Sequence, residues 1–72
     1  MQDEITAIER EISDFEGEQA ACEARIRALQ TEEDPANGVF RHEEIHAAKQ
    51  DKLRLACEVQ LRRVKINRLR LE

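Results

Sequence analysis

The sequence predicts an all-α protein: an antiparallel two-helix coiled-coil hairpin that dimerises into a four-helix bundle. Two long stretches carry mostly apolar residues at alternating steps of three and four, which keeps one narrow stripe on one side of each helix. The single break between them holds the only proline. Charged residues make up 39% of the 72 residues and aromatic ones 3%, a composition typical of long paired helices. So short a chain buries few layers of side chains, which favours an oligomer.

The first helix is expected over about residues 3–31. Asp3 and Glu4 lie where carboxylates favour the N-terminus of a helix. Its stripe is unbroken and consists of Ile5, Ile8, Ile12, Phe15, Gln19, Cys22, Ile26 and Leu29. A second strip, on the side away from this stripe, consists of Gly17, Ala21, Ala24 and Ala28. This small-residue strip is either plain helix-forming surface or a place where another helix approaches closely.

A turn is expected over about residues 32–38. Pro35 cannot continue the preceding helix but suits a first helical turn, with Asp34 as its possible cap. Asn37 and Gly38 tolerate left-handed backbone geometry. Because the connection is short, the two helices are expected to be antiparallel neighbours.

The second helix is expected over about residues 39–70. Its matching stripe consists of Ile45, Ala48, Lys52, Leu55, Val59, Arg62, Ile66 and Leu69. Folding the chain at Asn37 brings the two stripes together as one seam, with a partner for every member from Ile5 against Leu69 to Leu29 against Ile45. This register predicts that the two helices form an antiparallel hairpin.

Charge favours the same pairing. Residues 1–34 hold eleven acidic residues and three arginines, a net charge of −8, whereas residues 35–72 hold nine basic and five acidic residues, a net charge of +4. An antiparallel fold places the acidic beginning beside the basic end. Single surface ion pairs contribute little, but their summed sign selects antiparallel over parallel helices.

The second helix carries another row of regularly spaced residues on nearly the opposite face from the seam. This outer row consists of His46, Gln50, Leu53, Cys57, Gln60, Val64, Asn67 and Leu71, with Leu61 beside it. A lone hairpin would leave its apolar members in water, and exposed apolar rows mark protein contacts. The predicted oligomer interface is therefore Leu53, Cys57, Leu61, Val64 and Leu71. The alternative is an ordinary solvent-exposed surface with scattered leucines.

Two groups of residues could carry chemistry. His42-Glu43-Glu44-Ile45-His46 resembles the H-E-x-x-H signature of zinc peptidases, in which histidines four apart on a helix bind one metal. Such an enzyme needs a third ligand, a sheet edge for its substrate and a cleft, and the chain offers no strand, so His42 and His46 are expected to be surface or interface residues. Cys22 lies in the seam and Cys57 in the outer row, so an internal disulfide is not expected. We expect no enzyme activity, no cofactor and no metal.

These observations favour a non-enzymatic protein–protein interaction module, such as an adaptor, assembly factor or inhibitor of a larger protein, acting as a homodimer. The alternative is a dimeric nucleic-acid-binding regulator, similar in architecture to small plasmid RNA-binding regulators. Its possible phosphate contacts are Arg62, Arg63, Lys65, Arg68 and Arg70. The acidic start lacks the features of a signal peptide, and no apolar run has the length of a membrane span, so we expect a cytoplasmic protein without membrane contact.

Overall fold

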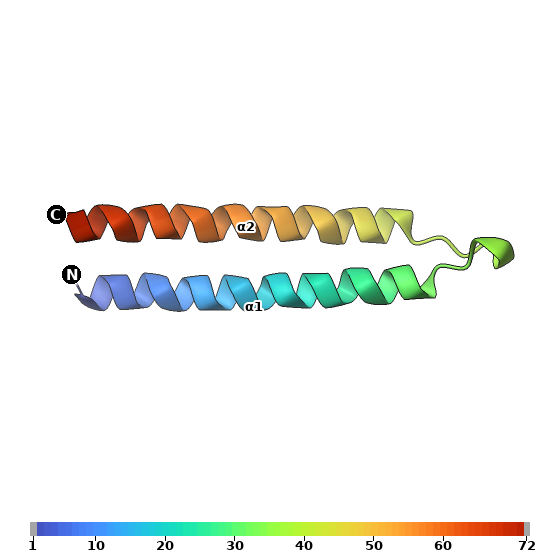
Figure 1. Ribbon diagram of the computed structural model, residues 1–72, viewed down its shortest axis with the longest axis horizontal. Coiled ribbons are helices and arrows are strands. Elements are labelled where there is room, and N and C mark those ends of the chain that lie inside the picture. The colour runs from blue at the N-terminus through green and yellow to red at the C-terminus, as the bar shows by residue number, and fades with distance from the viewer. Residues whose placement is uncertain (1, 72) are drawn as a thin grey trace.

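The protein is a helical hairpin. The computed structural model describes residues 2–71, so Met1 and Glu72, the two ends of the predicted domain, lie outside the described residues. Helix α1 spans Gln2–Glu32, a short 3₁₀ turn spans Pro35–Asn37, and helix α2 spans His42–Leu71. The two helices lie side by side in opposite directions, with both termini at one end and the turn at the other (Figure 1). The predicted hairpin is confirmed; its pairing with a second copy stays a prediction.

Helix α1 agrees with the predicted bounds to within one residue at each end. Asp3 and Glu4 occupy its first turn, where their carboxylates complement the unpaired backbone N–H groups and the helix dipole. Its buried side chains are all members of the predicted seam: Ile5, Ile8, Ile12, Ile26 and Leu29. The spacing of these residues therefore determines which face of α1 turns inward.

Helix α2 begins at His42, three residues later than predicted. A two-way backbone hydrogen bond causes the delay: the Asp34 N–H donates to the Val39 carbonyl and the Val39 N–H to the Asp34 carbonyl, each at 2.9 Å. Gly38 closes this tight loop with a φ of 74°, in the left-handed region that favours glycine. Val39 is thereby held in a bridge and not in the first turn of α2.

The predicted capping role of Asp34 is only half right. Asp34 occupies the N-cap position of the 3₁₀ turn, but its carboxylate makes no hydrogen bond to the backbone there. It accepts instead from the side-chain amide of Asn37. Arg41 closes the outside of the turn, with Nε 3.5 Å from Glu32 Oε2 and Nη1 3.7 Å from Glu44 Oε1.

The core is a single line of side chains between the helices, divided into two clusters. One cluster lies toward the termini and consists of Ile5, Ile8, Ile12, Val59 and Ile66, with Phe15 and Leu69 packed against it. The other lies near the turn and consists of Ile26, Leu29, Ile45 and Ala48. Both clusters join residues that the predicted register pairs. Leu55, the most buried side chain at 2% exposure, lies at the level of the polar seam residue Gln19 between them.

Two cations occupy seam positions without being buried there. Arg62 reaches out of the seam to Glu11, with 3.4 Å between Nε and Oε2, and also pairs with Glu58 on its own helix. Its guanidinium carbon lies 4.9 Å from the centre of the Phe15 ring, so it also covers the end of the apolar cluster. Lys52 behaves likewise, with Nζ 3.1 Å from Glu23 Oε1. Acidic side chains of α1 therefore neutralise both cations at the protein surface.

Candidate interaction surface

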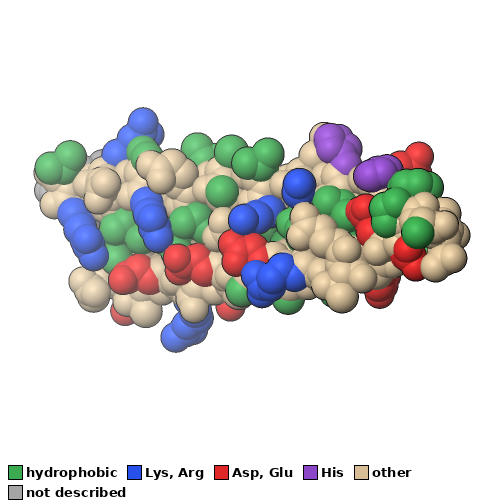
Figure 2. All heavy atoms as spheres, turned by 45° about the vertical axis from the view of Figure 1, so that its right-hand side comes forward, with side chains coloured by type: hydrophobic (Ala, Val, Ile, Leu, Met, Phe, Trp, Pro, Cys, Tyr) green, Lys and Arg blue, Asp and Glu red, His purple; other side chains and the backbone are tan. Residues whose placement is uncertain are grey.

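The outer row of α2 lies on the side of the hairpin that turns away from α1. The seven-residue period that buries the seam places these residues on nearly the opposite side of the same helix. The exposed fractions are 68% for Leu53, 61% for Leu61, 39% for Val64 and 87% for Leu71. Figure 2 shows hydrophobic side chains along this outer edge of α2. Cys57 is exposed among them as a free thiol. The structure thus brings the five predicted interface residues to one open face.

A groove runs beside Leu53, along one flank of the hairpin. It has a volume of about 490 Å³, and Ile26, Leu53 and Ala56 provide its apolar lining. Charged side chains at its edges are Glu23, Arg27, Lys49 and Lys52, and Gln19 completes it. Sequence reasoning missed this groove. The available signal was the polar residue Gln19 in the seam, because α1 contributes no large apolar side chain there.

The outer side of α2 carries positive charge without matching acids. From residue 46 to residue 71 the helix has only two acidic residues, Asp51 and Glu58, and Glu58 pairs with Arg62. Among residues 2–71, no salt bridge involves Lys49, Arg54, Lys65 or Arg68. The outer row is therefore an apolar line bordered by Lys49, Arg54 and Arg68, whereas Lys65 lies farther round the helix.

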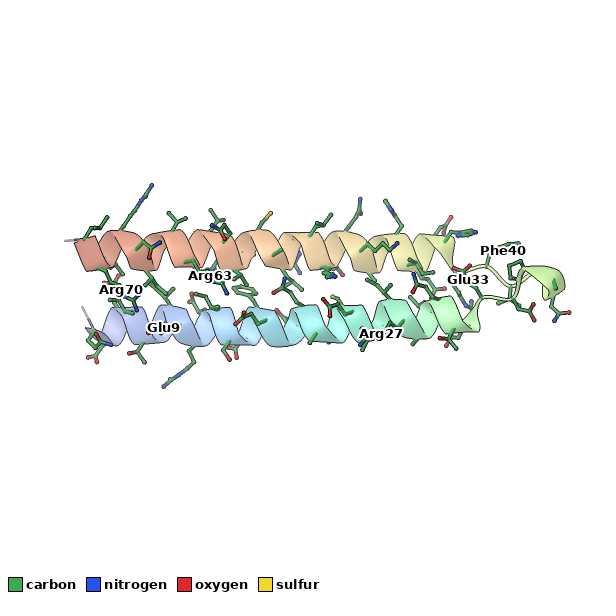
Figure 3. The ribbon with its side chains drawn as sticks, viewed as in Figure 1. Glu9, Arg27, Glu33, Phe40, Arg63 and Arg70 are labelled. Carbon is green, nitrogen blue, oxygen red and sulfur yellow. The ribbon has the colours of Figure 1, made fainter. Side chains whose placement is uncertain are left out.

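The five predicted phosphate contacts do not all face the same way. Arg62 is engaged with Glu11, and Arg63 Nη2 lies 3.3 Å from Glu16 Oε2. Arg63 and Arg70 line a hollow between the helices together with Glu9 of α1 (Figure 3). The remaining two members of the set, Lys65 and Arg68, are exposed. Acidic side chains of α1 thus pair with part of the basic run of α2.

The two histidines lie at the start of α2. His42 begins the helix and stacks on Phe40, with 5.5 Å between the ring centres, and His46 is exposed one turn later. Phe40 is 54% exposed and was missed by sequence reasoning, which placed it inside the helix. Within residues 2–71, no three His, Cys, Asp or Glu side chains come together as a metal site requires. Cys22 is a half-buried free thiol in the seam.

The small-residue strip of α1 is open surface in the hairpin. Ala21, Ala24 and Ala28 are exposed, and a Cβ atom placed on Gly17 would meet no atom within 4 Å. Nothing in the described chain therefore approaches α1 closely at this strip. It remains the competing candidate for a contact with another protein.

Comparisons with known proteins give no family for the chain. No protein-family model matches it, and no curated protein or solved structure is significantly similar to it. Between residues 2 and 71, neither helix has an apolar stretch of the length needed to cross a membrane.

Proposed function

We propose that the chain is a non-enzymatic protein–protein interaction module that self-associates through the outer row of α2. The observation that carries this proposal is the alignment of Leu53, Leu61, Val64 and Leu71 on one exposed face. Adaptors, assembly factors and inhibitors of larger proteins are the roles that such a module serves. The hairpin has its own core, so the outer row is available for a partner without unfolding.

The exposed area of this row is large enough to matter for association. Complete burial of a leucine contributes about 1.5–3 kcal/mol. Scaled by exposed fractions of 61–87%, each of the three leucines would contribute roughly 1–2.5 kcal/mol on burial. Association costs an estimated 4–15 kcal/mol in lost freedom. One chain's row offsets only part of that cost, so two rows that bury each other support a weak, concentration-dependent dimer.

The alternative function is nucleic-acid binding by the basic half of α2. Lys65 and Arg68 support it, because both are exposed and have no ion pair among residues 2–71. The acidic residues of α1 that hold Arg62 and Arg63 count against it, as does the net charge of −4. Binding to generic RNA or DNA that weakens steeply with salt would favour this alternative.

A pair of matched double variants tests the proposal. Leu53→Glu with Val64→Glu adds two negative charges to the outer row, and Ala21→Glu with Ala28→Glu adds the same charge to the small-residue strip. We expect the first variant to be a helical monomer and the second to associate like the unaltered chain, by light scattering and circular dichroism. Loss of association in the second variant alone would move the interface to α1 and overturn the proposal.

A further inference from the structure

We propose that the outer row is covered by the outer row of a second copy, laid antiparallel, with Leu53 of each chain against Val64 of the other. This inference rests on the proposed function and names its partner and register. It follows from two observations, the symmetric spacing of the row and its exposed apolar members. The cations that border the row determine how the contact depends on salt.

The row is symmetric in its spacing. From His46 to Leu71 its steps are 4, 3, 4, 3, 4, 3 and 4, which read the same from either end. An antiparallel second copy can therefore meet every member with another member. Two of the four kinds of pair match in chemistry, because Leu53 meets Val64 and the side-chain amide of Gln50 meets that of Asn67. The other two kinds of pair join His46 with Leu71 and Cys57 with Gln60. A buried amide pair such as that of Gln50 and Asn67 fixes the register of paired helices.

Other registers use the row less well. Sliding the second copy by one heptad in one direction places Gln60 against Val64 and leaves His46 and Gln50 without partners. Sliding it the other way places His46 against Val64 and leaves Leu71 exposed. Only the full overlap gives every member of the row a partner, over 26 residues or about 38 Å of helix.

The same register places Leu61 beside its own copy at the twofold axis. Leu61 is 61% exposed in the hairpin, so the axis supplies an apolar cover that the single chain lacks. An isologous contact of this kind closes on itself and stops at a dimer. Because the outer row faces away from α1, the four helices lie in a line, with the two α2 helices in the middle, and not in the compact four-helix bundle expected from the sequence.

The bordering cations give the contact an unusual dependence on salt. In this register Lys49 lies toward Arg63 of the second copy and Arg54 toward Arg68 of the second copy. Neither Arg54 nor Arg68 has an ion pair among residues 2–71. Exposed like charges repel weakly and are screened by salt, so apolar contact prevails and association tightens as salt rises. An acidic helical partner or a nucleic acid on the same face would show the opposite dependence.

Disulfide trapping tests the register. Leu53→Cys and Val64→Cys are made as separate variants in full chains that also carry Cys22→Ser and Cys57→Ser. In the proposed register each new thiol is offset from its own copy by eleven residues, about 16 Å along the axis, but faces the other variant's thiol. We expect mild oxidation to crosslink the mixture and neither variant alone. Circular dichroism is the check that both surface variants keep the hairpin.

Each other result has a definite meaning. Crosslinking of the separate variants would establish parallel pairing and overturn the proposal. Absence of a crosslink in the mixture would overturn the register. If the outer row's double-glutamate variant is nevertheless monomeric while the unaltered chain associates, the proposed function survives that failure. If the double-glutamate variant associates unchanged, the proposed function fails as well.

A charge reversal distinguishes the second copy from an acidic partner. Arg54→Glu turns the two symmetric Arg54–Arg68 repulsions into attractions. We expect self-association measured by sedimentation at 50 mM NaCl to tighten by roughly five- to tenfold, and the tightening to vanish at 500 mM NaCl. Lys65→Glu, which changes the charge equally away from the row, serves as the control. Weaker self-association of the Arg54 variant would overturn the proposal.

Discussion

Gly17→Ala is expected to stabilise the hairpin by about 0.8–1 kcal/mol, the difference in helix propensity between the two residues. Gly17 lies at the midpoint of α1, fifteen residues from each end. An added methyl group would meet no atom within 4 Å, so no steric cost opposes the gain. For a domain of this size the melting temperature should rise by about 4–8 °C per kcal/mol. Thermal and urea unfolding at one fixed protein concentration measures both values.

The same substitution at Gly38 is the matched control, and its sign should be opposite. Gly38 also has no atom within 4 Å of an added Cβ, but its φ of 74° lies in the left-handed region. A residue with a side chain costs about 1–2 kcal/mol there, so Gly38→Ala should destabilise the hairpin by that amount. A lower stability or an altered mass for Gly17→Ala would refute the reasoning, because it would show that another helix packs on the small-residue strip.

Three further predictions concern the core, the register and the histidines. Ile8→Ala should cost about 2–5 kcal/mol in urea unfolding, because Ile8 is 5% exposed within the larger cluster. Cysteines at Ile5 and Leu69, in a chain without its native thiols, should crosslink within one chain at low concentration, whereas exclusively intermolecular crosslinks would contradict the register. Stoichiometric zinc or a chelator should leave the melting temperature unchanged, and a large zinc-dependent rise would establish a metal site that uses His42 and His46.

The hairpin could be predicted from the sequence because the spacing of apolar residues determines most of its structure. Every side chain that is buried in α1 or α2 belongs to the seam read from the sequence. Lys52 and Arg62 show the limit of what the spacing of apolar residues can predict. Their positions were predicted correctly, but only the structure shows that they reach the carboxylates of Glu23 and Glu11.

The turn shows the limit of local sequence signals more clearly. Pro35 and Gly38 located the break, yet the start of α2 depends on a backbone bridge between Asp34 and Val39. Such a bridge competes with the first helical turn through hydrogen bonds that no side-chain pattern encodes. Phe40 was consequently placed in the helix by sequence and found exposed beside His42.

The interaction surface was predictable in position but not in shape. The spacing of Leu53, Val64 and Leu71 identified an outer face, and their exposed fractions agree with it. The groove beside Leu53 was not predicted, because its shape depends on how the side chains around Gln19 pack and not on the spacing of apolar residues alone. Which molecule covers this face depends on association between molecules, so it must be measured in solution.

Sedimentation equilibrium of the unaltered chain over a wide range of concentrations tests the central claim most directly. One chain has a mass of 8.4 kDa. Self-association through the outer row predicts a reversible rise from this mass to twice its value as concentration increases, and a midpoint that moves to lower concentration as salt rises. A mass that stays at 8.4 kDa at the highest concentration would contradict the claim.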